Sequence, residues 1–144
     1  MIKEAKPVLQ ELDEAGCLRL ISPGGVGRIA YVGSYDLTVL PVNYRLVGGA
    51  VVFRTAAGGL MAEDLRTGIA RGEYKVAFEV DHLDAAAREG WSVLIQGPAH
   101  HLDAAGEQEA ARRAGVEPWA PGERSHFIRI TPVRVTGRWV GRPV

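Results

Sequence analysis

Alternating apolar and polar positions predict a β-hairpin in the first half of the chain. Residues Val39 to Val47 and Ala50 to Thr55 are rich in β-branched and aromatic side chains, as strands are. Gly48 and Gly49 join the two stretches, and a two-glycine loop tolerates the positive φ angles of a tight turn. The sequence therefore predicts two adjacent antiparallel strands here.

Further apolar stretches predict the rest of a sheet. Gly97 and Pro98 indicate a bulge or a sheet edge within one of them, and Pro132 interrupts the last. Glycine is abundant, at 18 residues, and falls mainly between the apolar runs, which is typical of a β-rich fold. The predicted strands are Val26 to Gly33, Tyr74 to Val80, Trp91 to His100, and Phe127 to Val140.

Helical spacing of apolar residues predicts three helices. A helix over about residues 6–21 ends at the turn signal Ser22 to Gly25, a short helix covers Gly59 to Arg71, and an exposed helix covers Ala104 to Ala114. We expect a polar connection from Asp81 to Gly90. About six strands without a βαβ rhythm predict a mostly β fold, an antiparallel barrel or closed sheet with flanking helices, in a single domain over residues 1–144.

Charge and cysteine content narrow the function classes. The chain has 17 basic and 17 acidic residues, so no overall field attracts nucleic acid or a membrane surface. Cys17 is the only cysteine, which excludes an intrachain disulfide, and we expect it to be a buried thiol. The sequence shows neither a signal-peptide pattern nor an apolar run of membrane-spanning length. We expect a soluble cytoplasmic protein that binds neither nucleic acid nor membrane.

Arg54 is the first candidate for chemistry, because it is a cation at the end of an apolar strand. A glycine-rich turn follows it, and the predicted helix from Gly59 begins with its amide groups directed back toward Arg54 and Thr55. Guanidinium and amide donors would converge there on an anion. The alternative is an arginine at a strand end that extends its charged group into solvent.

Other candidate chemistry has weaker support. His100 and His101 are adjacent, so on a strand they point to opposite faces, and no metal-ligand spacing occurs. Ser92 lies outside any hydrolase motif. Glu79 and Asp81 share a strand face, but solvated charges explain them more simply than a catalytic pair.

The order of several segments resembles the pyridoxamine 5'-phosphate oxidase-like family of flavin-binding split barrels. A helix is followed by GGVGRIAYV, LPVNY, GGAVVFRTAAG, VAFEVD, GWSVLIQGPAH, PWAPGER and IRITPVRVTGR, so the similarity runs from about Leu12 to Arg138. It implies a six-stranded antiparallel split β-barrel and a homodimer that holds FMN at the subunit interface.

The resemblance also implies site residues. Residues 41–44 match the strand along the isoalloxazine ring, Arg54 and Thr55 match the segment that grips the phosphate, and Trp119 lies in a loop that reaches the other subunit's site. One departure is Leu60, where the family usually has a lysine; Arg66 is a candidate to compensate, and weak FMN binding or a different ligand are alternatives. The cofactor-binding residues implied are Pro41, Val42, Asn43, Tyr44, Arg54, Thr55, Gly58, Gly59, Trp91, Ser92 and Trp119.

The function implied is an FMN-binding oxidoreductase acting on a small-molecule substrate. Because the flavin carries the electrons, no side chain has to serve as a dedicated acid or base. Two alternatives stay open: a deazaflavin-dependent reductase of the same fold, and a non-enzymatic split barrel that sequesters haem or flavin.

Overall fold

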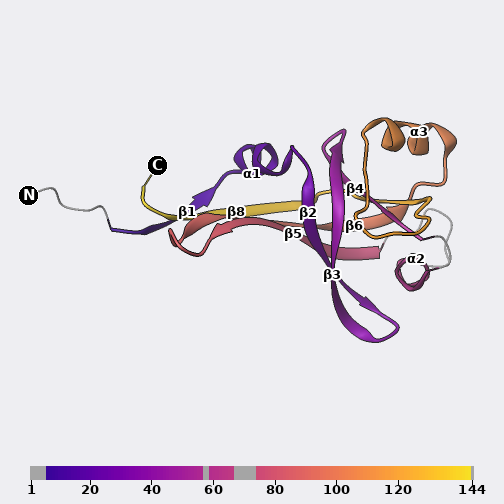
Figure 1. Ribbon diagram of the computed structural model, residues 1–144, viewed down its shortest axis with the longest axis horizontal. Helices are drawn as coiled ribbons and strands as arrows, with labels where there is room; N and C mark the ends of the chain where they lie inside the picture. The colour runs from indigo at the N-terminus through magenta and orange to yellow at the C-terminus, as the bar shows by residue number, and fades with distance from the viewer. Residues whose placement is uncertain (1–5, 57–58, 67–73, 144) are drawn as a thin grey trace, which may run out of the picture.

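The computed structural model describes residues 6–56, 59–66 and 74–143. Within these ranges the strands form one antiparallel sheet in the order β1-β8-β6-β5-β2-β3-β4-β7. Strands β1 and β8 lie at one end of the molecule, and helices α2 and α3 lie at the opposite end (Figure 1). In chain order the elements are β1 (Val8–Leu12), α1 (Glu14–Ile21), β2 (Gly25–Gly33), β3 (Asp36–Val47), β4 (Ala50–Thr55), α2 (Leu60–Asp64), β5 (Tyr74–Asp84), β6 (Glu89–His101), α3 (Ala105–Arg113), β7 (His126–Ile130) and β8 (Arg134–Gly141).

Strand β6 closes the sheet into a barrel. One of its edges pairs with the whole of β5, while its other edge pairs first with β8 and then with β7. Since β7 also pairs with β4, strands β2 to β7 form a closed ring of six, and β1 and β8 extend the sheet beyond it. The predicted six-stranded antiparallel barrel with flanking helices is therefore confirmed, with two additional strands.

The two pairings of β6 meet at Gly97, where the sequence predicts a bulge or an edge. The connection from β7 to β8 crosses β6 there, with Thr131 N donating to Pro98 O at 3.0 Å and Val133 N donating to Gln96 O at 2.9 Å. A Cβ atom at Gly97 would lie 2.0 Å from Thr131 O. The stretch predicted as one strand interrupted at Pro132 is thus two strands with different partners.

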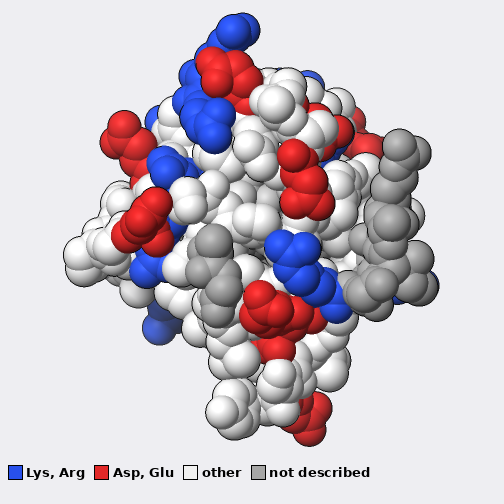
Figure 2. Space-filling view, turned by 90° about the vertical axis from the view of Figure 1, so that its right-hand side faces the viewer, with Lys and Arg blue, Asp and Glu red and all other residues white. Residues whose placement is uncertain are grey.

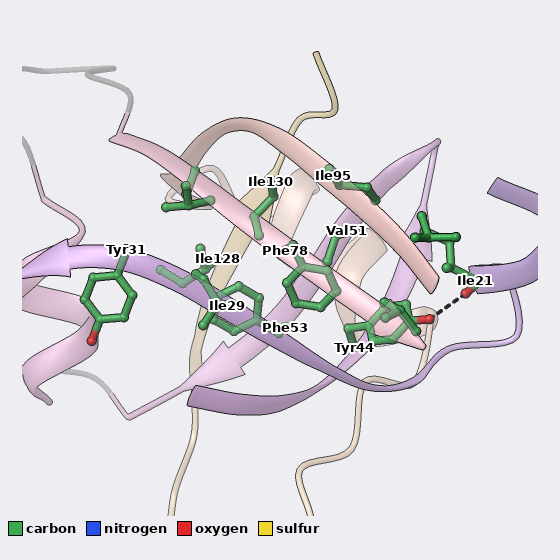
Figure 3. Close-up of a cluster of buried hydrophobic side chains, with 14 of the residues drawn as sticks. Ile21, Ile29, Tyr31, Tyr44, Val51, Phe53, Phe78, Ile95, Ile128 and Ile130 are labelled. Carbon is green, nitrogen blue, oxygen red and sulfur yellow. Dashed lines mark hydrogen bonds between the residues drawn. The ribbon is translucent and has the colours of Figure 1, made fainter. Parts of the chain in front are cut away.

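The barrel interior is filled by side chains that alternate along every strand (Figure 3). Tyr44 lies among them, edge-on to Phe78 with ring centroids 5.3 Å apart, and its hydroxyl donates to Ile21 O at 2.8 Å. This hydrogen bond ties the end of α1 to the barrel, and burial raises the pKa of Tyr44 to about 12. Fully buried members include Ile29, Val51, Phe53, Phe78, Ile95, Ile128 and Ile130.

Helix α3 covers the opposite surface of β4 and β7 with a second apolar cluster. Its Ala111 packs with Val52, Leu102, Val116 and Phe127, all of them buried. The helix predicted over Ala104 to Ala114 is therefore confirmed to within one residue at each end. Its packing places the segment after α3 beside the end of β4.

The predicted N-terminal helix over residues 6–21 is wrong in its first half. Residues Val8 to Leu12 form β1, which pairs with β8 from Val8 opposite Gly141 to Leu12 opposite Gly137. The Asp13 carboxylate accepts from Gly16 N at 2.7 Å and so caps a helix that begins at Glu14. In that helix Cys17 is buried, as expected, and burial raises the pKa of its thiol.

Two other boundaries differ from the prediction. The helix expected over Gly59 to Arg71 is α2, which ends at Asp64; residues 67–71 lie outside the described residues. The expected polar connection from Asp81 to Gly90 is shorter, because β5 continues to Asp84 and β6 begins at Glu89. No helix within the described ranges combines the length and the apolar character needed to cross a bilayer.

We expect Gly97→Ala to destabilise the fold by more than about 2 kcal/mol, because its Cβ would collide with backbone rather than with a movable side chain. Urea denaturation measures the difference. The matched control is Gly106→Ala in α3, where nothing lies within 4 Å and alanine favours the helix by about 0.5–1 kcal/mol. Equal unfolding midpoints for the two variants would show that β6 does not need a glycine at the crossing.

Candidate functional site

Strands β2, β3, β5 and β6 share a surface that points away from the barrel interior, which we call the outer face. Buried Ile29 pairs with buried Phe78, so the neighbouring pair, Arg28 and Glu79, projects to the other side of the sheet. The same alternation applies to β3 and β6. The outer face comprises Arg28, Ala30, Val39, Pro41, Asn43, Ala77, Glu79, Asp81, Ser92 and Leu94.

A pocket of about 260 Å³ lies on the outer face. Four apolar side chains line it together with three charged ones. Pockets that hold small ligands usually measure roughly 300–1,000 Å³ and cover most of the ligand, so this pocket is smaller than a typical ligand site. The lining residues are Arg28, Ala30, Val39, Ala77, Glu79, Asp81 and Leu94.

The charges in this pocket are unbalanced. Arg28 Nη1 lies 3.5 Å from Glu79 Oε1 and 3.5 Å from Asp81 Oδ2, so one guanidinium serves two carboxylates. Burial, followed by a hydrogen bond with Asp81 and the charge of Asp81, raises the pKa of Glu79 to about 7, although Arg28 opposes the rise. Glu79 can therefore gain or lose a proton near neutral pH.

The pattern of the sequence places Glu79 and Asp81 on one face but does not reveal their pocket. The structure confirms the shared face and adds Arg28, which faces Glu79 from the adjacent strand. The available signal was three charged residues at outward positions beside the apolar inward residues Ile29, Phe78 and Val80. Which of these charged side chains contact one another depends on the pairing of β2 with β5. That pairing joins residues far apart in the chain, so local sequence does not predict it.

The structure separates the residues implied along the ring. Pro41 and Asn43 lie on the outer face, whereas Val42 and Tyr44 point into the barrel. Their role in cofactor binding stays a prediction, and for the inward pair any contact with a ligand on the outer face would have to come from the backbone.

Trp91 and Ser92 divide in the same way. Ser92 lies on the outer face opposite Asp81. Trp91 lies on the other side of the sheet, where it packs against the core and stacks on His82 with ring centroids 6.4 Å apart. The two residues therefore border different surfaces.

Arg54 and Thr55, implied together at the phosphate, point to opposite sides of β4. Arg54 Nε donates to Arg124 O at 2.6 Å and Nη1 donates to Val116 O at 3.4 Å. Thr55 is buried on the barrel side, opposite His126. The two side chains therefore lie on different surfaces of β4, and their role in binding a phosphate stays a prediction.

The turn that was expected to supply amides is described only in part. Gly59 is the N-terminal cap of α2, which contains five residues, and Gly58 lies outside the described residues. Leu60, in the position of the usual lysine, is half exposed.

Trp119 lies close to the outer face. Its backbone N–H donates to Asn43 Oδ1 at 2.8 Å, and the residue is 82% exposed. A single chain therefore leaves a large aromatic side chain uncovered beside the residues implied along the ring.

A second polar cluster lies near α2. His101 of β6 contacts His126 of β7 through ring nitrogens. Burial, together with the charge of Arg66, lowers the pKa of both imidazoles, that of His101 to about 4, so both are neutral at pH 7. Within the described ranges no three His, Cys, Asp or Glu side chains are placed to hold a metal ion.

At the end of the molecule that carries α2 and α3, acidic and basic side chains are intermixed among uncharged ones (Figure 2). The visible face shows no surface of a single sign.

Comparison with known proteins agrees with the fold. The model of a family described as pyridoxamine 5'-phosphate oxidase matches residues 13–139. The chain is 32% identical over 127 residues to the uncharacterized protein Rv0080 of Mycobacterium tuberculosis, which covers 88% of this chain and 82% of that protein.

Two solved structures are also similar. One is the FAD binding protein from Mycobacterium smegmatis, at 28% identity and a TM-score of 0.72, covering 90% of this chain and 98% of that one. The other is the conserved protein of unknown function DIP1874 from Corynebacterium diphtheriae, at 31% identity and a TM-score of 0.69, covering 90% of this chain and 96% of that one.

We expect the Glu79 carboxyl group to titrate near pH 7 in carbon-13 NMR. Asp81→Asn should lower the midpoint, because it removes a like charge, and Arg28→Ala should raise it. Since the folded-state pKa exceeds the ordinary 4.5, Glu79 favours the folded state most below pH 4.5, and this contribution is lost as the pH rises through about 7. A midpoint near 4.5 in the unmodified protein would contradict the burial of this carboxyl group.

Proposed function

The chain belongs to the pyridoxamine 5'-phosphate oxidase family, and on that basis we propose that it is a flavin-binding oxidoreductase that acts as a homodimer. The observation that carries the proposal is the partly enclosed apolar pocket on the outer face, with Pro41 and Asn43 on the neighbouring strand. When bound, a flavin supplies the electron transfer, and the protein supplies binding, orientation and electrostatics.

The outer face suits a flat aromatic ring. Ala30, Val39, Ala77 and Leu94 present small or aliphatic side chains around the pocket. Asn43 uses its Oδ1 to hold Trp119 N, so its Nδ2 group remains a donor for a carbonyl oxygen of the ring. Glu79 can hold or release a proton at the same surface near neutral pH.

Two arginines have guanidinium donors that could bind the anionic phosphate tail of a flavin. Arg124 and Arg129 each bury an Nε atom that meets no acceptor among the described residues. Unpaired buried donors are costly, so an anion that reached them would be bound favourably. If the anionic tail reaches these two arginines, they take the place of the lysine that Leu60 replaces.

A second copy would complete the site. Apolar side chains on the outward side of β2 and β3 are exposed in the single chain, among them Val32, Leu37 and Val39. An exposed apolar surface of this kind is typical of an interaction site. The exposed Trp119 adds an aromatic side chain that such a partner would cover.

FMN is the flavin that the family resemblance implies, and the similar Mycobacterium smegmatis protein is described as binding FAD. Both share the ring and the first phosphate, so the outer face would accept the common part of either. Their relative affinities identify the cofactor, and deazaflavin and haem belong in the same titration as the alternatives left open by the sequence.

We expect FMN or FAD to bind with a shift of the flavin absorption bands and quenching of tryptophan fluorescence. Absorption spectra between about 300 and 700 nm test this, followed by a screen for reductase activity toward small molecules. A protein that leaves the spectra of both flavins unchanged at high micromolar concentration would contradict the proposal.

We expect Val39→Asp to weaken both flavin binding and self-association, because it places a charge among the apolar side chains of the outer face. Analytical ultracentrifugation measures the oligomeric state. The matched control is Leu9→Asp on β1, since the two side chains are similarly exposed, 58% for Val39 and 63% for Leu9. A monomeric unmodified protein, or equal effects of the two variants, would contradict a dimer built on the outer face.

A further inference from the structure

The segment from Val116 to Arg124 connects α3 to β7 and carries Trp119. Most of its side chains are exposed, and Val116 alone among them is buried in the cluster beneath α3. Packing therefore holds one end of the segment but does not determine the course of the rest.

Three hydrogen bonds to the barrel determine that course. Arg54 Nε donates to Arg124 O at 2.6 Å, and Arg54 Nη1 donates to Val116 O at 3.4 Å. In the middle of the segment, Trp119 N donates to Asn43 Oδ1 at 2.8 Å. One guanidinium thus joins both ends of the segment, and one amide holds its centre.

The arginine is itself held in place. Its Cζ lies 5.2 Å from the centre of the Phe127 ring, and Phe127 pairs with Arg54 across the β4–β7 ladder. The planar guanidinium can donate hydrogen bonds in two directions at once. A lysine ammonium, on a single flexible side chain, does this less well. The side chain also points away from Thr55, the other residue implied at a phosphate.

We propose that Arg54 is a positioning residue that holds segment 116–124 so that Trp119 lies beside the outer face. Its effect on ligand binding passes through the position of Trp119 and not through a contact with a phosphate. This second part rests on the flavin-binding function proposed above, whereas the first part concerns the protein without ligand.

Fluorine NMR of the protein labelled with 5-fluorotryptophan tests the first part without ligand. The Trp119 signal, assigned with Trp119→Phe, should shift and narrow in Arg54→Ala as the indole gains mobility, and trypsin should cleave after Arg124 at least about tenfold faster. In Arg54→Lys the Trp119 signal and the cleavage rate should lie between those of the unmodified protein and Arg54→Ala, because one amine can replace one of the two hydrogen bonds.

The matched control is Arg45→Ala. Arg45 lies on the adjacent strand and also donates to a backbone carbonyl, Pro23 O at 2.7 Å, but this carbonyl is outside segment 116–124. Loss of the charge is the same in both variants. An unchanged Trp119 signal and unchanged cleavage in folded Arg54→Lys and Arg54→Ala, or equal changes in Arg45→Ala, would overturn the proposal.

The second part is tested by comparing FMN with riboflavin, which lacks the phosphate. If Arg54 acts through Trp119, Arg54→Ala weakens both ligands by the same factor, about tenfold for the loss of charged hydrogen bonds. A loss confined to FMN would show a direct phosphate contact and overturn this part. If the unmodified protein binds neither ligand, the proposed function fails, and the Trp119 signal and the cleavage rate still decide whether Arg54 holds the segment.

Discussion

The barrel and its outer face depend on how β6 divides one of its edges between two partners. The edge pairs with β8 up to Gln96 and with β7 from Ala99, and the connection between those partners passes over Gly97. Without a side chain at that point the crossing backbone can approach closely enough to keep its hydrogen bonds. The ring of six strands closes because of this crossing, and closure leaves no free edge on β7 to pair with another chain.

The register between neighbouring strands then determines which side chains lie together on the outside of the barrel. Since side chains alternate with a period of two, a slip of one residue between β2 and β5 would turn Arg28 inward and Ile29 outward. The apolar interior excludes that arrangement. The packing of the core therefore holds Arg28 against Glu79 and Asp81, although none of these three contributes to the core itself.

The local sequence pattern was sufficient to predict an element where the contacts that form it lie close together in the chain. The hairpin of β3 and β4 was predictable because strand alternation and the Gly48-Gly49 turn lie in one continuous stretch. The N-terminal stretch was not, since Val8, Leu9 and Leu12 have helical spacing and the partner of β1 lies more than a hundred residues away. The barrel could be inferred from strand number and segment order, whereas the shared edge of β6 required the three-dimensional pairing.

In the candidate site, too, local sequence did not predict which side chains lie together. Four consecutive strand residues cannot all present side chains to one ligand, so Pro41 and Asn43 face outward while Val42 and Tyr44 fill the interior. Arg54 was identifiable as an unusual cation on an apolar strand. Its partners were not, because Val116 and Arg124 reach it only through the packing of α3.

Asn43 joins the two parts of this site, which explains why an amide suits the position. Its Oδ1 accepts from Trp119 N, and the amide also carries an Nδ2 donor group. An aspartate would accept the same bond from Trp119, but it would add a negative charge to a face where Glu79 and Asp81 already outnumber Arg28. An aliphatic residue would leave the middle of segment 116–124 without its anchor. The amide accepts from the backbone of the segment, adds no charge to the outer face and carries a hydrogen-bond donor as well.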